Sequence, residues 1–457
     1  AAAAAAAANA PQGFINHGNS CYFSSALQLL LLLHSPLQKY LAAYDLPQGE
    51  PRALSTADSA SIRSAHAAQR FVQGLQEISR RAEAIEESVP GNSREDIESK
   101  KRKSHGSILN LLKQFIELYP STFVRYRQED AHEAFRAILH GIHRALQVPV
   151  PRADILYNVS GSIHQQSIVS DIFYGNLVSK IKCTVCGNVG QQCEAFMDLS
   201  LSLALEGRGE DTRVGASGSR RECGAIFNRR IAASHATTVG DTGQMITEKN
   251  IRDDRKRKRG EKNVPGFSGY VQRMLSPLSM IFGSPKSVPT LPLPPAALKS
   301  VDLVECLSNF FSAESLTGEN CSDCNNCSRR TPATKRFSLG LSPAMFCLHL
   351  KRFDGNAKLE RHVRFPLRGL DLSGFSSPTS SSSSSSSTFG VNPAINPSNW
   401  VYDLCGIIVH SGSSVQNGHF MAFVLPSHTQ QWFLCDDKTV SPTSAQTVAQ
   451  QQAYMLL

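Results

Sequence analysis

Apolar residues in the first third of the chain follow the spacing of helices. A Leu-rich run predicts a helix from Phe23 to Leu33, and Ile108 to Tyr119 predicts a second. A third helix is expected from Asp130 to Leu146, where apolar residues recur at helical spacing, namely Ala131, Phe135, Ile138, Leu139 and Ile142. We expect these helices to pack together.

Later segments alternate between apolar and polar residues as β-strands do. Strands are predicted over Phe173 to Lys182 and over Phe196 to Leu203, the latter with an apolar face of Leu199, Leu201 and Leu203. Alternation continues in four further runs, Lys335 to Phe353, Tyr402 to Val409, His419 to Leu425 and Gln431 to Cys435. The pattern predicts an α+β fold whose C-terminal part is a β-sheet.

Polar, low-complexity stretches interrupt these elements. The first ten residues are nearly all alanine, and stretches at about 45–105, 207–295 and 374–398 are rich in charged, Gly, Ser or Pro residues. We interpret the three as disordered insertions. A patch from Tyr270 to Phe282 could form a short docking helix inside the second one. Residues 11–457 are then one catalytic domain interrupted by insertions.

The composition excludes several classes of protein. A hydrophobic share of 41% indicates a globular chain, and the longest aliphatic run, Leu29 to Leu33, is far below the roughly 20 residues that a membrane span needs. We expect no secretory signal, and C-x-x-C pairs among 12 cysteines indicate an intracellular, reducing location. The net charge of +9 is concentrated in 100–103 and 255–259, which resemble nuclear-address segments or solvated tails. No aromatic residues alternate with these cations, which argues against nucleic-acid binding.

Cys21 is a candidate nucleophile because a turn from Asn16 to Ser20 precedes it and a helix begins about there. The positive end of a helix dipole favours a thiolate. The turn can also direct backbone N–H groups and the Asn16 amide at a developing oxyanion. A cysteine before a Leu-rich helix is otherwise most often a buried structural residue.

The matching base lies near the other end of the chain. His419 begins a predicted strand, and Asp436 and Asp437 end the next one. A histidine can take the thiol proton while a carboxylate on the adjacent strand orients its ring. Because adjacent strand residues face opposite sides, only one of the two aspartates can meet the ring. His410 is a rival base at the end of the preceding strand.

Two C-x-x-C pairs, Cys183 with Cys186 and Cys324 with Cys327, have the spacing of a zinc ribbon. Cys321 also precedes Cys324 by three residues, so the second pair could instead be Cys321 and Cys324. Four buried free thiols are the alternative to a metal site.

Three segments together resemble the ubiquitin-specific protease family. Residues 13–28 resemble its Cys box, and Tyr402 to Phe423 with Trp432 to Val440 resemble its His box, with Phe420 in place of the commoner Tyr. The resemblance implies the following site: Cys21 as nucleophile, His419 as base, Asp436 as third member, Asn16 in the oxyanion hole and Asp437 as an auxiliary acid.

The remaining family segments concern ubiquitin and zinc. Arg127 to Glu133 resembles the family's Gln- and Asp-containing box, which implies that Asp130 and Glu133 meet the basic C-terminal tail of ubiquitin. Carboxylates at i and i+3 share a helix face and can hold arginines, although an exposed acidic face is usually only solvated. Glu319 to Phe337 resembles the finger segment, which implies Cys324 and Cys327 as ligands of one structural zinc ion.

The implied fold is papain-like, with a helical thumb, a β-rich palm and zinc-ribbon fingers that hold ubiquitin. The implied activity is hydrolysis of the bond after the C-terminal Gly of ubiquitin by a monomeric thiol protease. Two alternatives stay open, a catalytically silent ubiquitin-binding adaptor and a protease for a ubiquitin-like modifier. A zinc-dependent nucleic-acid-binding protein would leave Cys21 and His419 unexplained. Residues 182–183 and 332–337 resemble a subgroup with nuclear members, so we expect the nucleus rather than the cytoplasm.

Overall fold

The computed structural model describes most of the predicted elements, and all described residues belong to one compact unit. They are residues 11–31, 35–44, 59–86, 108–149, 165–203, 300–354, 357–377, 400–414, 417–427 and 429–457. The predicted insertion at 207–295, with its docking patch, and most of the one at 374–398 lie outside this range. Within the described residues, no helix combines the length and apolar character needed to cross a bilayer.

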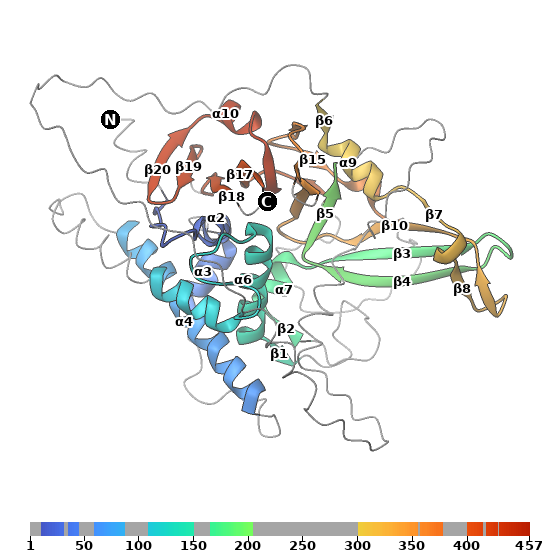
Figure 1. Cartoon of the computed structure of the whole chain (residues 1–457), viewed down its shortest axis with the longest axis horizontal. Coiled ribbons are helices and arrows are strands. Elements are labelled where there is room, and N and C mark those ends of the chain that lie inside the picture. The colour runs from blue at the N-terminus through green and yellow to red at the C-terminus, as the bar shows by residue number, and fades with distance from the viewer. Residues whose placement is uncertain are drawn as a thin grey trace, which may run out of the picture. The chain divides into compact units, whose positions relative to one another are not determined.

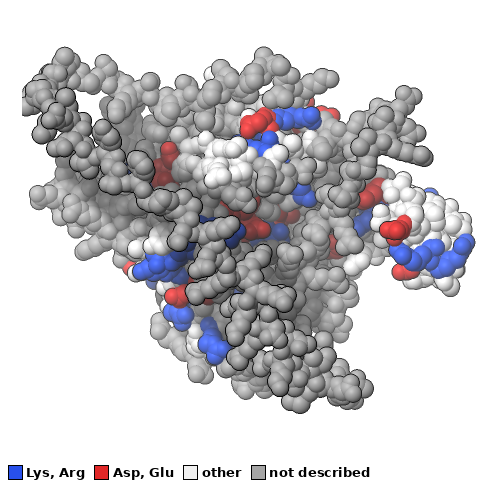
Figure 2. All heavy atoms as spheres, in the orientation of Figure 1, with Lys and Arg blue, Asp and Glu red and all other residues white. Residues whose placement is uncertain are grey.

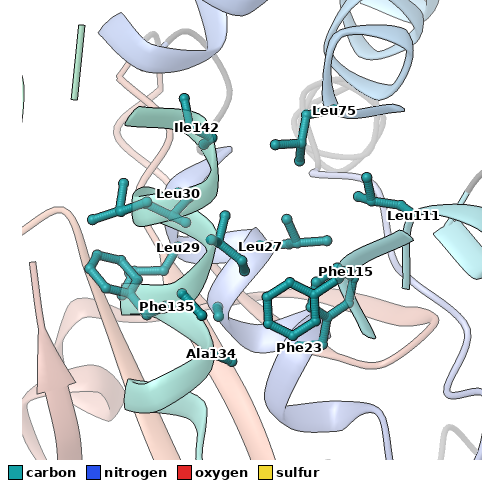
Figure 3. Packing of buried hydrophobic residues seen from close by; sticks show 14 of the residues in the cluster. Phe23, Leu27, Leu29, Leu30, Leu75, Leu111, Phe115, Ala134, Phe135 and Ile142 are labelled. Carbon is teal, nitrogen blue, oxygen red and sulfur yellow. The ribbon is translucent and has the colours of Figure 1, made fainter. Parts of the chain in front are cut away.

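Helices of the N-terminal half form a thumb around one apolar core (Figure 1). They are α2 (Cys21–Leu30), α3 (Pro36–Ala43), α4 (Ser59–Glu86), a helix over 108–118, α6 (Ala131–Leu146) and α7 (Ile168–Phe173). Phe23 and Leu27 of α2 lie against Phe115, and Phe135 of α6 lies on the other side of α2 (Figure 3). The three predicted helices are therefore confirmed, although α2 begins two residues before Phe23 and ends at Leu30, and α6 begins one residue after Asp130.

The prediction of a disordered insertion over 45–105 is wrong for its middle part, because α4 occupies 28 of these residues. Phe71, Val72, Leu75 and Ile78 are all buried in the thumb core. They recur at helical spacing, but polar residues on the remaining surface of α4 dominate the composition. The helix owes its stability to this buried stripe rather than to its average hydropathy.

A seven-stranded sheet forms the palm, in the order β20-β19-β18-β17-β21-β11-β5. Its strands are β5 (Asp198–Ser202), β11 (Cys347–Lys351), β17 (Gly406–Ser414), β18 (Asn417–Val424), β19 (Trp432–Asp436), β20 (Thr439–Thr443) and β21 (Ala453–Leu456). All neighbours are antiparallel except β11 and β5. Ile408 and Phe420 pack against the thumb, whereas Ile407 and Met421 pack into a second core on the opposite face.

A four-stranded sheet, in the order β4-β3-β10-β7, extends from the palm as the fingers (Figure 1). Its strands are β3 (Gly175–Cys183), β4 (Val189–Phe196), β7 (Glu314–Leu316) and β10 (Ala333–Leu341), and a ribbon of β8 (Ser322–Cys324) and β9 (Arg329–Thr331) lies at the tip. The tip carries more basic than acidic side chains (Figure 2). Exposed Lys182, Arg329 and Arg330 are the basic residues of this region.

The shorter elements connect these three parts. They are β1 (Val148–Pro149) with β2 (Gln165–Gln166), β6 (Val301–Asp302) with β14 (Val363–Arg364), β12 (Phe353–Asp354) with β13 (Ala357–Lys358), β15 (Leu370–Asp371) with β16 (Val401–Tyr402), α9 (Leu303–Phe310), α10 (Ala445–Ala449) and the 3-10 turns Gly318–Asn320 and Ser373–Phe375.

Several predicted strands have different bounds in the structure. Phe173 ends α7 instead of opening β3, and the predicted strand from Lys335 to Phe353 is divided among β10, β11 and β12. Likewise, the run from Tyr402 to Val409 contains the end of β16 and the first half of β17. Alternation marks strand residues, but it does not reveal where the chain leaves one sheet and enters another.

Candidate active site

Cys21 is the first residue of α2, at the point where the thumb meets β18. Ser20 is the N-cap residue of α2, and its carbonyl accepts hydrogen bonds from the backbone N–H groups of Phe23 and Ser24. The side chain of Cys21 is only 2% exposed. The sulfur therefore lies at the positive end of a helix dipole, where unpaired first-turn N–H groups favour negative charge.

Asn16 holds the turn before Cys21 against the far end of the palm sheet. The Ser20 backbone N–H donates to Asn16 Oδ1 over 3.0 Å, and Asn16 Nδ2 donates to Asp437 Oδ2 over 3.1 Å. A backbone N–H can only donate, so the first bond fixes which atom of the amide is the oxygen. Each NH₂ has two hydrogens, and the bond to Asp437 uses one of them.

His419 and Asp436 lie on adjacent strands, β18 and β19, and form a short hydrogen bond. His419 Nε2 is 2.6 Å from Asp436 Oδ1 but 3.9 Å from Asp437 Oδ2. The prediction that only one of the two aspartates meets the ring directly is therefore confirmed.

The imidazole of His419 also lies within hydrogen-bonding reach of the Cys21 thiol. Hydrogen bonding to Cys21, with a smaller contribution from Asp436, outweighs burial and raises the pKa of His419 to about 9. Because Nε2 faces Asp436, the ring has Nδ1 available for the sulfur. Cys21, His419 and Asp436 thus form one hydrogen-bonded group from segments near opposite ends of the chain.

Asp437 lies beside this group in a left-handed backbone conformation with φ of 49°. Burial raises the pKa of its carboxyl, although the Asn16 amide and His419 oppose that shift. Its carbonyl oxygen accepts a hydrogen bond of 2.8 Å from the Phe14 backbone N–H. Asp437 thereby ties the segment before Cys21 to the strand that carries Asp436.

His410, the rival base, is buried on β17, where it pairs with Phe420 of the adjacent strand β18. Its ring packs edge-on against Phe353 and Phe420, and neither ring nitrogen has a hydrogen-bond partner among the described residues. Burial lowers the pKa of His410 to about 4. A Cβ atom at Gly418 would lie 2.3 Å from His410 Nε2, so only glycine fits there. His410 supports the strand but does not face Cys21.

Gln128 lies in the segment that resembles the Gln- and Asp-containing box, but the sequence patterns gave it no role in the site. Its Nε2 donates to the Gly418 carbonyl over 2.6 Å, and its Oε1 accepts from the Gly418 N–H over 3.3 Å. Gln128 is buried, and Gly418 directly precedes His419. One thumb side chain therefore fixes the backbone that carries the imidazole.

Asp130 and Glu133 lie at the start of α6, and the structure gives them different environments. Asp130 is the N-cap of α6, where Oδ1 accepts from the backbone N–H groups of His132 and Glu133 over 2.7 and 3.2 Å. Its Oδ2 accepts a hydrogen bond from the hydroxyl of Tyr454 in β21. The surface of Glu133 is exposed overall, but partial desolvation of its carboxyl, and next the nearby Asp130 carboxylate, raise the pKa of Glu133.

A buried polar group anchors α6 to the palm below these residues. His132 Nε2 lies 2.8 Å from Asp198 Oδ2, and Arg136 Nε lies 3.2 Å from Asp198 Oδ1. The His132 ring stacks on His349 at 3.9 Å. Burial alone would raise the pKa of Asp198, but its contacts with His132 and Arg136 hold it well below its usual range.

The four cysteines of the two C-x-x-C pairs meet at the tip of the fingers. The sulfurs of Cys183, Cys186, Cys324 and Cys327 all lie within 4.8 Å of one another, with Cys186 and Cys324 at 3.5 Å. Sulfurs about 2.3 Å from a tetrahedral ion are roughly 3.8 Å apart, so the group fits one metal ion. Cys321 is outside it, which favours the pair of Cys324 and Cys327 over the pair that includes Cys321.

A thiol at a helix start, bonded to an imidazole that a carboxylate orients, is the arrangement of papain-like thiol proteases. The fold agrees, because a solved structure of the SAGA Ubp8/Sgf11/Sus1/Sgf73 DUB module bound to ubiquitin aldehyde aligns with 98% of this chain and 69% of that chain. The TM-score is 0.56 at 20% identity. The predicted thumb, palm and fingers are confirmed by this likeness.

The chain belongs to the ubiquitin carboxyl-terminal hydrolase family, whose model matches residues 12–457. Ubiquitin carboxyl-terminal hydrolase 3 from human is 26% identical over 352 residues, which cover 73% of this chain and 49% of the relative. Ubiquitin carboxyl-terminal hydrolase 2 from chicken is 25% identical over 360 residues, which cover 75% and 71%. The chain thus spans about half the length of the first of these relatives. The predicted resemblance to ubiquitin-specific proteases is confirmed.

Proposed function

We propose that this chain is a deubiquitinating cysteine protease that hydrolyses the peptide or isopeptide bond after the C-terminal Gly of ubiquitin. The observation that carries the proposal is the hydrogen-bonded group of Cys21, His419 and Asp436 at the start of α2. Family membership supplies the substrate class, since the matching model is that of ubiquitin carboxyl-terminal hydrolases.

In the first half of the reaction, the Cys21 thiolate attacks the carbonyl carbon of the terminal Gly. The raised pKa of His419 favours a proton on the imidazole beside the thiolate. As the tetrahedral intermediate collapses, His419 gives that proton to the leaving lysine amine, and the C–N bond breaks to leave a thioester on Cys21.

The oxyanion of the intermediate forms between the start of α2 and Asn16. The second hydrogen of the Asn16 amide and the Cys21 and Tyr22 backbone N–H groups are the proposed donors, since those of Phe23 and Ser24 already bond to the Ser20 carbonyl. The Asp437 carboxylate orients the Asn16 amide by accepting a hydrogen bond from its other hydrogen. Donors that are already oriented need no reorganisation when charge develops.

In the second half, water attacks the thioester carbonyl while His419 accepts the water proton. The C–S bond breaks, the ubiquitin carboxylate leaves, and the thiolate–imidazolium pair forms again. Asp436 keeps the imidazole oriented through both halves.

We assign the four-cysteine group at the fingertip to one structural zinc ion. Four thiolates from two short turns are the ligand set of zinc ribbons, and the sulfur spacing fits tetrahedral coordination. With four protein ligands the ion has no open position for a substrate, so its proposed contribution is to stabilise the fingers.

We propose that ubiquitin lies on the palm and fingers with its basic tail near the start of α6. Glu133 is the better placed of the two predicted contacts, because Asp130 already accepts bonds from the α6 backbone and Tyr454. The neighbouring DUB module was solved with ubiquitin aldehyde, which supports the same partner here. A monomer in the nucleus remains our prediction for the assembly and location.

The test is reaction with ubiquitin that carries a thiol-reactive group at its C-terminus. We expect a covalent adduct with the wild-type protein and none with Cys21→Ala, measured by intact-protein mass spectrometry. Adduct formation only with a probe of a ubiquitin-like modifier would move the substrate class to that modifier. No adduct from folded, zinc-loaded protein would refute the protease and favour the silent adaptor.

A further inference from the structure

The segment from Val124 to Arg127, called here the 124–127 loop, exposes large side chains beside the nucleophile turn. Val124 is 48% exposed and Tyr126 is 66% exposed, and both are among the large hydrophobic residues that the described part of the chain leaves at its surface. The loop lies between the helix over 108–118 and α6. Exposed aromatic and arginine side chains are typical of residues that anchor a partner.

The loop is held in a strained conformation by the turn that precedes Cys21. Tyr126 has φ of 64°, a left-handed conformation that is strained for a bulky residue. Asn19 Nδ2 donates to the Tyr126 carbonyl over 3.0 Å. The Tyr126 ring covers Gly18 so closely that a Cβ there would lie 2.6 Å from the ring. Tertiary contacts thus fix an exposed tyrosine against Gly18, three residues before the nucleophile in the sequence.

The charge of the loop is positive at its surface. The Arg125 guanidinium lies 4.9 Å from the Tyr126 ring centroid and donates to the tyrosine hydroxyl over 3.1 Å. Arg127 is 64% exposed and pairs with Glu129, which is itself buried. Arg125 and the tyrosine therefore form a preoriented pair that offers a cation and an apolar surface together.

We propose that the 124–127 loop binds an acidic segment of the protein on the leaving side of the scissile bond, next to the lysine that ubiquitin modifies. This proposal rests on the proposed function. The tail of ubiquitin is basic, so a cationic loop does not suit it, whereas the exposed carboxylate of Glu133 does. The cationic 124–127 loop therefore suits an acidic leaving-side protein, and the acidic Glu133 suits the basic tail of ubiquitin.

The test compares two kinds of substrate. One is ubiquitin with a small fluorogenic amide as leaving group, and the other is ubiquitin joined to the lysine of a peptide whose flanking residues are acidic, neutral or basic. For Arg125→Glu and Tyr126→Gly, we expect kcat/KM on the acidic peptide to fall about 3- to 10-fold, more at low salt than at high salt. Glycine adopts the left-handed conformation freely, so Tyr126→Gly keeps the backbone of the loop.

Hydrolysis of the small amide reports on the chemistry alone, and both variants should retain it. Arg70→Glu is the matched control, because Arg70 is an exposed arginine of α4 outside the loop, and it should leave the preference for acidic peptides unchanged. Equal loss on both substrates, or a wild type that shows no preference among the peptides, would overturn the proposal. Failure of the wild type on the small amide would instead overturn the proposed function.

Discussion

The region where Cys21 of α2 meets His419 and Asp436 of the palm, called here the catalytic junction, is stabilised in a different way from the fingers. At the junction, two apolar cores lie on opposite faces of the palm sheet. Hydrogen bonds also join segments far apart in the sequence: Asn16 and Asp437 are 421 residues apart, and Gln128 and Gly418 are 290 residues apart. In the fingers, β4 has mostly exposed residues and the tip has four thiols in place of a core. Where too little apolar surface can be buried, a metal ion can replace the core, which is the contribution proposed for these four clustered thiols.

Replacing Cys21 should cause the largest loss of hydrolysis rate, and it should leave ubiquitin binding by the fingers unchanged. Cys21→Ala is expected to reduce hydrolysis of a ubiquitin substrate by at least about 1,000-fold, because the proposed thioester forms on the Cys21 sulfur. Binding of ubiquitin, measured by calorimetry, should persist, since the fingers are unchanged. Residual turnover near the wild-type rate would mean that another residue is the nucleophile.

Removing the Asn16 amide should have the next largest effect. We expect Asn16→Ala to lower kcat by about 100- to 1,000-fold with little change in KM, the cost of losing one oxyanion donor. Steady-state kinetics on the small fluorogenic amide provides the measurement. A change in KM alone would contradict the oxyanion role, and it would show that Asn16 only supports the turn.

The Gln128 contact can be tested as a positioning device for His419. Gln128→Ala should lower kcat by roughly 10- to 100-fold and change the pH profile, because the Gly418 backbone is no longer held. Gln128→Glu keeps the acceptor for the Gly418 N–H and should recover part of the rate. If unfolding temperature falls but the pH profile of the folded enzyme stays the same, the contact is only structural.

Metal removal should separate the two regions. Chelation, or Cys186→Ser, is expected to weaken ubiquitin binding by at least about tenfold and to lower the cooperativity of unfolding, since metal binding contributes directly to the folding of such sites. Near-ultraviolet circular dichroism from the aromatic residues of the thumb core should change little. Loss of that signal would show that the fingers and the junction fold as one unit.

The pH dependence should show the smallest effect and concerns the junction alone. Since the pKa of His419 is raised to about 9, its protonated form is stabilised by folding. That stabilisation is complete below pH 6.5 and is lost as the pH rises through 9. We expect kcat/KM to fall on the alkaline side near pH 9.

Asp436→Asn removes one of the contacts that favour the protonated ring, so the alkaline limb should move to lower pH. An alkaline limb that does not move would exclude Asp436 as a partner of the imidazole. The control is Asp403→Asn, since Asp403 is an exposed residue whose carboxylate accepts a hydrogen bond from the Gly369 backbone N–H.

Much of the site followed from local sequence, because each part has a local signature. The turn before Cys21, the strand start at His419 and the paired cysteines are short segments whose chemistry depends on neighbouring residues. The contact of Gln128 with Gly418 has no such signature, although Gln128 lies in a recognised segment, since its partner is a backbone group that any residue type would offer. The helix α4 was missed for a similar reason, because a narrow buried stripe is hidden among polar residues.

The sequence by itself determined the class of fold, the nucleophile and base candidates and the four metal-ligand candidates, because periodicity and spacing act over a few residues. Only the tertiary structure decided which aspartate meets His419 and why His410 is not the base. It also decided how Gln128 holds the Gly418 backbone of β18, next to His419. These contacts join separate strands and loops, 17 residues apart for His419 and Asp436 and 290 apart for Gln128 and Gly418, and they depend on how two apolar cores pack on one sheet.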